Sequence, residues 1–368
     1  MSLQKEIEDK AKEIQTDSYP MSIGELINMY RDDELEVHPE FQRFFRWSDG
    51  QKSKFIESIL LGIPIPPIFV AQGEDGVWDV IDGLQRLSTI LEFIGILKSK
   101  SVTLMPPSKL QATEFLPSLE GKVWDNPHDE ENSFTREQRI NFKRAKLDIN
   151  IIKRSSDKDA KYELFQRINS GGTKLSEQEL RNCLLIMLDK EFYTWAKALC
   201  EFESFRSCIP LSERLLSEQY DMEIVMRFLV YRHVDINSIK GNEDINDFIT
   251  KQIIKIIEEK KLDREEEMTI FKETFIYLDE LLAEDSFKKF DSNKEQFKGP
   301  FLISSFEALV VGISENLNKL KQKQDNDVVN IIKEIYESSE FLDIIQKNIR
   351  PINRLKELTI NSRRVFDI

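Results

Sequence analysis

The chain has 368 residues, of which 40% are hydrophobic and 32% are charged, and its formal net charge is −14. This length allows two domains with a core in each. The acidic balance excludes a general affinity for nucleic acid or anionic lipid, so a polyanionic partner requires a local basic patch. The longest apolar stretch, residues 59–71, is too short and too rich in proline to span a membrane.

The cysteine content and the N-terminal sequence indicate the compartment. Only three cysteines occur and none forms a CxxC pair, which is typical of a reducing environment. Residues 1–15 are charged throughout and lack the apolar core of a signal peptide. We therefore expect a cytoplasmic protein without a membrane partner.

The first half of the chain mixes the periodicities of helices and strands. Two capping boxes, at Ser48 and at Thr135, each open a predicted helix. Predicted helices occupy residues 22–30, 48–61, 84–97 and 136–146. Two β-rich runs separated by GEDG predict a hairpin, and a further strand follows the basic helix; these runs are residues 66–72, 77–82 and 147–153. Residues 34–47 alternate like an extended segment, and residues 98–132 have no clear pattern.

The second half of the chain is almost entirely helical in pattern. Apolar residues recur at intervals of three to four in residues 159–172, 177–188, 222–234, 245–260, 268–284, 301–317 and 328–341. The first of these helices ends at paired glycines, and Ser176 caps the next one. We predict an α+β fold in three parts: a helical lead (residues 1–20), an α+β domain (21–156) and a mostly α-helical domain (157–368).

The sequence VWDVIDGLQRLSTI, residues 77–90, combines the features of an anion site. A helix that begins after Gly83 presents unpaired backbone N–H groups and a partial positive charge, and glycine lets a ligand approach the backbone closely. Arg86 supplies a planar fork of donors suited to phosphate oxygens. Ser88 and Thr89 add hydroxyl groups. The residues together predict a phosphate-binding turn.

Asp82 needs a separate explanation, because a carboxylate repels a phosphate unless something intervenes. It can hold Arg86 from four residues away, coordinate a Mg²⁺ ion that bridges phosphates, or take a proton from attacking water. Gln85 could orient that water, as glutamines do in some nucleotide hydrolases. The alternative is that Asp82 caps the helix, Gly83 makes a tight turn and Arg86 is a paired surface residue.

A second arginine cluster lies upstream, in EFQRFFRW, residues 40–47. If this extended segment lies near the hairpin, Arg43 could approach Arg86, and an anion would be needed to hold both cations. The alternative is that the aromatic side chains anchor a core while the arginines reach solvent. Farther along, Gly171 and Gly172 can form a backbone concavity for an anion, or simply end a helix.

Four motifs resemble, in order and spacing, the DGQQR-motif domain at the N-terminus of GmrSD-type modification-dependent restriction systems. They are FQRFFRW, FIESILLGIPIPPIFV, VIDGLQRLSTI and LFQRINSGGTKLSEQELRN, and they span about the first half of the chain. The resemblance implies a small mixed-sheet core of the ParB and sulfiredoxin type. It also implies binding and hydrolysis of a nucleoside triphosphate, and a role in defence against foreign DNA.

The resemblance assigns roles to particular residues. The four residues that match its signature are Asp82, Gly83, Gln85 and Arg86, and Arg43 matches the upstream arginine. The residues that match a later loop over the same site are Asn169, Gly171 and Gly172. Leu84 departs from the pattern, because the family has a glutamine there, so the role of that first glutamine does not carry over to this chain.

Nuclease chemistry of the His-Asn-His kind is not predicted. The three histidines, His38, His128 and His233, are far apart in the sequence, and each is better explained as structural or solvated. The most basic stretch, residues 136–154, could contact nucleic acid through one helical face, although most charge runs are solvated helix surfaces. The residues assigned to that face are Arg136, Arg139, Lys143 and Lys146.

The leading hypothesis is a nucleotide-binding and NTP-hydrolysing regulatory or sensing protein of a restriction-like defence system. Arg43 and Arg86 would hold phosphates, while Asp82 would bind Mg²⁺ or activate water that Gln85 positions. DNA and a partner nuclease subunit are the candidate macromolecular partners. Two alternatives stay open: a DNA-binding or nuclease module on the same core, and a helical interaction module whose motif loop is inactive.

Overall fold

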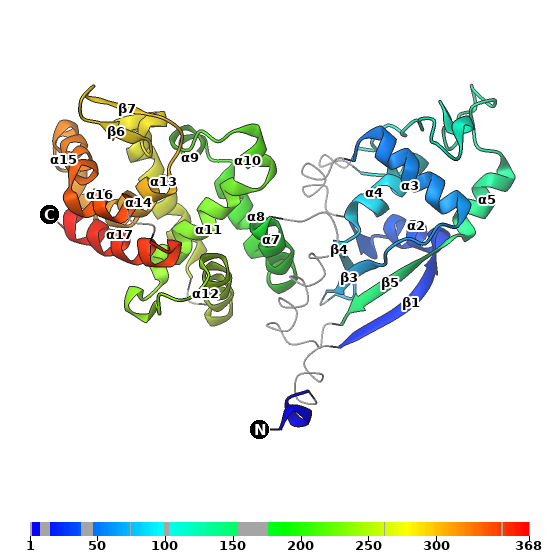
Figure 1. The fold of residues 1–368 in the computed structure, drawn as a ribbon, viewed down its shortest axis with the longest axis horizontal. Helices are drawn as coiled ribbons and strands as arrows, with labels where there is room; N and C mark the ends of the chain where they lie inside the picture. Colours follow the sequence, from blue (N-terminus) through cyan, green and yellow to red (C-terminus); the bar gives the residue numbers. More distant parts are fainter. Residues whose placement is uncertain are drawn as a thin grey trace. The chain divides into compact units, whose positions relative to one another are not determined.

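The computed structural model describes residues 2–7, 15–37, 47–73, 75–98, 103–153, 176–260, 262–346 and 349–367. The chain divides into two compact units, residues 1–175 and 176–368. The predicted boundary after residue 156 falls outside the described residues and stays a prediction. The α+β prediction is confirmed, because unit 1 contains a five-stranded mixed sheet and unit 2 is mostly helical (Figure 1).

The sheet of unit 1 has the strand order β1-β5-β3-β4-β2. Its strands are β1 (Thr16–Ser22), β2 (Leu35–Glu36), β3 (Ile68–Gln72), β4 (Trp78–Asp82) and β5 (Lys146–Ile152). Strands β3 and β4 form the antiparallel hairpin expected around GEDG, and β3 pairs in parallel with β5. Strand β1 pairs antiparallel with β5 along its full length. Residues 16–20 are therefore strand, and the prediction that they belong to a helical lead is wrong.

Four helices of unit 1 match the predicted ones. They are α2 (Ile23–Arg31), α3 (Asp49–Leu61), α4 (Leu84–Ile94) and α5 (Arg136–Arg144). Both predicted capping boxes are present, with Ser48 on α3 and Thr135 on α5. Gly95 adopts a left-handed conformation and ends α4 slightly before the predicted position. Residues 103–132 are irregular apart from a 3₁₀ turn at Pro117–Leu119 and isolated β-bridges at Leu104 and Val123.

One hydrophobic core joins α2, α3 and α4 to the sheet, and these helices pack against the same sheet face (Figure 1). Alternation along the strands decides which residues enter this core, because every second side chain points to the same face. In β5 these residues are Leu147, Ile149 and Ile151. An aromatic cluster of Phe93, Trp124, Phe134 and Phe142 attaches the irregular segment and α5 to α4.

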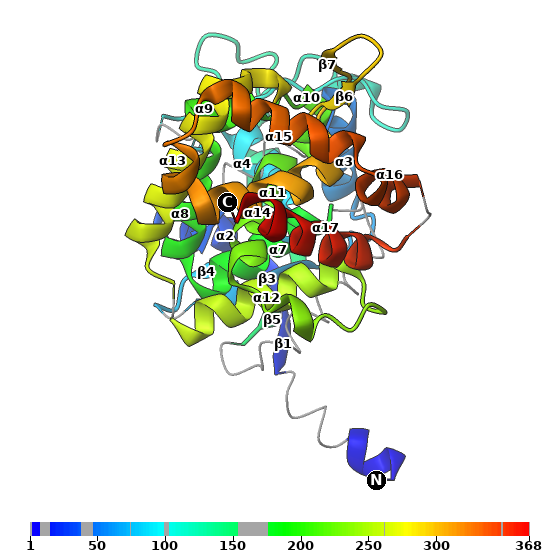
Figure 2. The ribbon, with the colours of Figure 1, turned by 90° about the vertical axis from the view of Figure 1, so that its left-hand side faces the viewer.

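Unit 2 is a helical bundle with one small hairpin. Its helices are α7 (Glu177–Leu188), α8 (Lys190–Cys200), α9 (Glu203–Cys208), α10 (Glu213–Ser217), α11 (Tyr220–His233), α12 (Ile245–Glu259), α13 (Arg264–Leu282), α14 (Ile303–Leu320), α15 (Asp325–Glu337), α16 (Ser339–Gln346) and α17 (Pro351–Phe366). Its hairpin, which the sequence did not predict, consists of β6 (Lys289–Asp291) and β7 (Gln296–Lys298). Helices α14 and α17 lie side by side (Figure 2). Among the described residues, no helix is long and apolar enough to cross a membrane.

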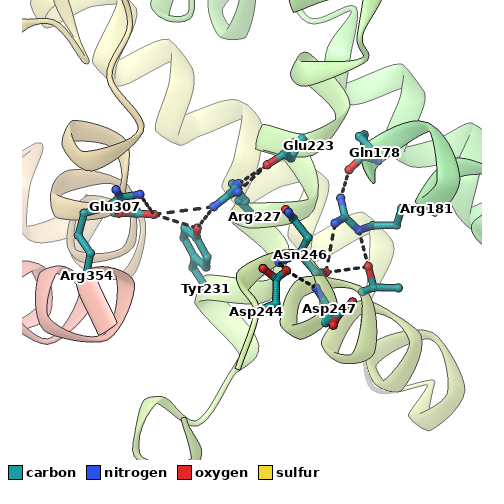
Figure 3. Close-up of polar contacts among 11 residues, drawn as sticks. Gln178, Arg181, Glu223, Arg227, Tyr231, Asp244, Asn246, Asp247, Glu307 and Arg354 are labelled. Carbon is teal, nitrogen blue, oxygen red and sulfur yellow. Dashed lines mark hydrogen bonds and ion pairs between the residues drawn. The ribbon is translucent and has the colours of Figure 1, made fainter. Parts of the chain in front are cut away.

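Charged side chains occupy the centre of this bundle (Figure 3). Glu307 of α14 is fully buried and accepts hydrogen bonds from Arg354 of α17, at 2.7 and 3.2 Å. The Tyr231 hydroxyl donates to Glu307 over 3.4 Å, and Arg227 donates to that hydroxyl over 2.8 Å. Glu223 completes the network on Arg227. Two carboxylates thus face two guanidinium groups, which limits the cost of burying them.

Candidate functional site at the β4–α4 junction

Gly83 links the strand β4 to the helix α4 and has a backbone angle φ of +91°. A β-carbon at this position would lie 2.8 Å from Ile68 Cγ1 and 3.2 Å from Arg86 Nη2. The turn therefore needs glycine for two reasons, the left-handed backbone and the close approach of β3. The one-residue connection places Asp82 at the strand end directly beside the first turn of α4.

We expect Gly83→Ala to lower the free energy of unfolding by about 2–3 kcal/mol, because strain at a positive φ adds to the contact with Ile68. Gly76→Ala is the matched control. Gly76 has a φ of +89°, and a β-carbon added there would have no atom of the described residues within 4 Å, so only the backbone cost of about 1 kcal/mol applies. Urea unfolding of both variants measures the difference, and equal losses would show that the contact with Ile68 contributes nothing.

The Arg86 side chain connects three segments of unit 1, namely the end of β4, the start of α4 and the residues before β3. Its Nη2 atom lies 2.7 Å from Asp82 Oδ2, and its Nη1 atom donates to the carbonyl oxygens of Pro67, at 3.0 Å, and of Pro66. The Arg86 side chain is only 12% exposed, whereas that of Asp82 is 44% exposed. Of the three explanations for Asp82, the structure shows the first, in which the carboxylate holds Arg86 from four residues away. The roles in Mg²⁺ binding and proton transfer remain predictions.

Gln85 has a contact that the sequence did not predict. Its Oε1 atom accepts a hydrogen bond from the backbone N–H of Trp47 over 3.2 Å, and the Trp47 ring packs edge-on against Phe55 of α3. The last residue of the arginine-aromatic motif, Trp47, is therefore fixed beside the first turn of α4. Arg43 itself lies outside the described residues, so its approach to Arg86 remains a prediction.

The N-terminus of α4 lacks a side-chain cap. The other three helices named for unit 1 are each capped by a hydroxyl group, from Ser22, Ser48 or Thr135. The first hydrogen bond of α4 runs from the backbone N–H of Leu87 to the carbonyl oxygen of Gly83. The preceding N–H groups have no intrahelical acceptor, as in any α-helix, and no side chain of the described residues accepts from them instead. An anion can occupy that position.

Ser88 and Thr89 are both buried in α4. The Ser88 hydroxyl has no hydrogen-bond partner among the described residues. Leu84, the residue that departs from the family signature, is partly buried and packs against the core of unit 1. An apolar side chain at position 84 therefore contributes to packing. Asn169, Gly171 and Gly172 lie outside the described residues, and their predicted role at this site is untested.

The predicted basic face is only partly helical. Arg136, Arg139 and Lys143 lie on α5, but Lys146 is the first residue of β5, so its assignment to the helix is wrong. Helix α5 ends at Arg144 because Ala145 leaves the helical conformation and leads into the strand. Arg139 forms an ion pair of 2.5 Å with Asp125.

Histidine and cysteine side chains do not gather into a site within the described residues. His233 Nε2 lies 3.0 Å from Glu267 Oε1. Burial opposes ionisation of Glu267, yet hydrogen bonds from His233 and Arg232 lower its pKa below the usual value. Burial raises the pKa of the Cys208 thiol to about 12. The described part of the chain holds no group of three histidine, cysteine or acidic side chains placed to bind a metal ion.

Comparison with known proteins identifies the domain that carries this site. Residues 23–186 match the family model described as "GmrSD restriction endonuclease, N-terminal domain". The match begins at α2, includes the β4–α4 junction and ends within α7 of unit 2. The chain matches no curated protein and no solved structure. Residues 23–186 are thus a GmrSD-type N-terminal domain, and the chain is related to the proteins of restriction systems.

Proposed function

We propose that the β4–α4 junction binds the phosphates of a nucleoside triphosphate, and that the chain is a nucleotide-dependent regulatory or sensing component of a restriction-like defence system. The observation that carries the proposal is the uncapped N-terminus of α4 behind a glycine turn. Its free N–H groups and the positive end of the helix dipole suit a phosphate group. The family supplies the restriction context.

The two charged residues take different roles in this proposal. Arg86 is largely buried and already has acceptors, so it holds the turn in shape and contributes positive potential. The carboxylate of Asp82 holds Arg86 through one oxygen but is more exposed, so its other oxygen can face the ligand. Mg²⁺ is commonly held by one or two carboxylates together with substrate phosphates, and Asp82 could serve as such a ligand. Bound there, Mg²⁺ would neutralise charge on the phosphate oxygens.

The same placement of Asp82 and Gln85 would support hydrolysis of the bound nucleoside triphosphate. A water oxygen attacks the γ-phosphorus, the bond to the β–γ bridging oxygen breaks, and a nucleoside diphosphate and phosphate are released. Asp82 accepts the proton of the water. The Gln85 Oε1 atom is engaged by Trp47, which leaves its Nε2 group to orient the water or a phosphate oxygen.

The substitution Gln85→Glu tests binding without disrupting the fold. The glutamate keeps an oxygen acceptor for the Trp47 N–H, and a carboxylate in the first turn of a helix is favourable for stability. It also repels phosphate from the uncapped turn. We expect ATP, GTP or CTP with Mg²⁺ at a hundred times its dissociation constant to stabilise the wild type by about 2.7 kcal/mol. The variant should unfold at an equal or higher temperature without ligand and should not respond to nucleotide.

Phosphate release separates hydrolysis from binding. Asp82→Asn should lose phosphate release, because the amide cannot accept the proton. Its stabilisation by nucleotide should be retained if Asp82 acts only as the base, and weakened if Asp82 also holds Mg²⁺. Glu218→Gln, at the exposed ion pair between Arg214 and Glu218 in unit 2, is a charge-matched control that should change neither measurement. No stabilisation of the wild type by any of the three nucleotides, with or without DNA, would overturn the proposal and favour an interaction module with an inactive loop.

A further inference from the structure

Helix α5 carries a row of exposed cations at the surface of an acidic protein. Arg136, Lys143 and Arg144 are exposed on α5, and Lys146 follows on β5. Residues at positions i, i+7 and i+8 lie on one face of a helix, and the exposed Ile140, at i+4, lies between them. Residues 136–146 hold five cations, four of them in this exposed row, in a chain with a net charge of −14.

Five cations of unit 1 form ion pairs, whereas the four cations of this row form none among the described residues. Ion pairs engage Lys52, Arg86, Lys98, Arg139 and Lys153. Among the described residues, Arg136, Arg144 and Lys146 have no acidic partner, and the Lys143 ammonium lies 5.9 Å from the centre of the Trp124 ring. The nearest acids in sequence are Glu137 and Asp148, and neither forms an ion pair with this row. The cations therefore remain available to an external anion.

The helix dipole explains the positions of Lys143 and Arg144 but not the position of Arg136. Lys143 and Arg144 occupy the last turn of α5, where a cation favours the negative end of the helix dipole. Arg136 occupies the first helical position, where a cation is unfavourable. A local sequence choice that opposes stability without a compensating contact indicates a function at that position.

We infer that the face of α5 formed by Arg136, Lys143 and Arg144, extended by Lys146, binds the phosphate backbone of a nucleic-acid duplex. Nine helical residues span about 14 Å, which suits a short run of phosphates along one strand. The face has no exposed aromatic side chain on which unpaired bases could stack, which argues against a single strand. It has one exposed apolar residue, Ile140, and Phe142 is buried, which argues against insertion into a membrane surface.

A fluorescence anisotropy titration with a labelled 20-base-pair DNA duplex tests this inference. With three to four phosphate contacts, the logarithm of the association constant should fall with the logarithm of salt concentration with a slope of about −3 to −4. The triple variant Arg136→Gln, Lys143→Gln, Arg144→Gln should bind at least tenfold more weakly. Its salt slope should be smaller in magnitude by about 3, because each lost phosphate contact removes about one unit.

Two controls make the result specific to this face. The triple variant Arg214→Gln, Lys251→Gln, Lys255→Gln removes the same charge from exposed positions of unit 2 and should bind DNA like the wild type. The double variant Arg136→Lys, Arg144→Lys preserves the charges and should retain most binding. Equal losses in both triple variants would overturn the inference, as would tighter binding of the single strand. Loss of binding to anionic phosphatidylserine vesicles in the α5 variant, with DNA binding unchanged, would also overturn it.

Discussion

Glu307→Gln is expected to lower the free energy of unfolding of the helical unit by about 3–5 kcal/mol. The substitution keeps the shape of the side chain and removes the charge that the buried guanidinium group of Arg227 and the partly buried one of Arg354 face (Figure 3). Arg227 keeps Glu223 as a partner, but Arg354 loses its one carboxylate among the described residues. Breaking a buried ion pair from one side costs this much because the remaining charge stays desolvated.

The matched control is Glu340→Gln, which removes the same charge from an ion pair with Arg364 that is more than half exposed. Its expected cost is about 0–1 kcal/mol, because water screens and solvates both partners. Urea unfolding followed by circular dichroism compares the two variants, since the helical signal comes mostly from unit 2. If Glu307→Gln lowered the free energy of unfolding no more than Glu340→Gln, water would hydrate Arg354 in the variant, and the network would contribute little to stability.

Gly312→Ala is expected to lower the free energy of unfolding by about 2–3 kcal/mol. Gly312 lies in the middle of α14, where alanine would ordinarily be preferred by about 1 kcal/mol. An added β-carbon would, however, overlap the Ser362 carbonyl oxygen, lie 2.8 Å from the Ser362 carbonyl carbon and lie 2.6 Å from Phe366 Cδ2. Two of these atoms belong to the backbone of α17, so the two helices must move apart to relieve the contacts. The cost of this overpacking exceeds the gain from the helix propensity of alanine.

Gly50→Ala provides the comparison, because Gly50 lies in α3 and the nearest atom to its added β-carbon is 3.4 Å away, at the end of the Gln111 side chain. That variant should be neutral or slightly more stable. Thermal unfolding measures both variants, and hydrogen exchange of α14 and α17 shows where the loss occurs. If Gly312→Ala were also neutral, the close approach of α14 and α17 would not be needed for stability.

Local signals in the sequence identified much of the fold. Ser48 and Thr135 marked the starts of α3 and α5 because a hydroxyl followed three residues later by glutamine satisfies backbone groups locally. The GEDG turn identified the hairpin for a similar local reason. The strand β1 was missed, because its edge position leaves five of its seven residues exposed and weakens the alternation of burial. Its pairing with β5 depends on residues more than a hundred positions away.

One residue of the buried network of unit 2 is recognisable from the sequence alone. Glu307 interrupts the apolar run of α14, and a carboxylate in such a run needs a buried partner. Its partners are Arg354 and Tyr231, and only the packing of α11, α14 and α17 reveals them. No pattern of spacing brings together residues from three helices.

By itself, the sequence determined that a strand, a glycine turn and a helix meet at Asp82, Gly83 and Arg86, because each preference acts over four or five residues. Only the tertiary structure decided what those residues contact. Arg86 reaches the carbonyl groups of the segment before β3, and Gln85 holds the N–H of Trp47. These contacts join segments that are about twenty and forty residues apart, and hydrophobic packing of α3, α4 and the sheet brings them together.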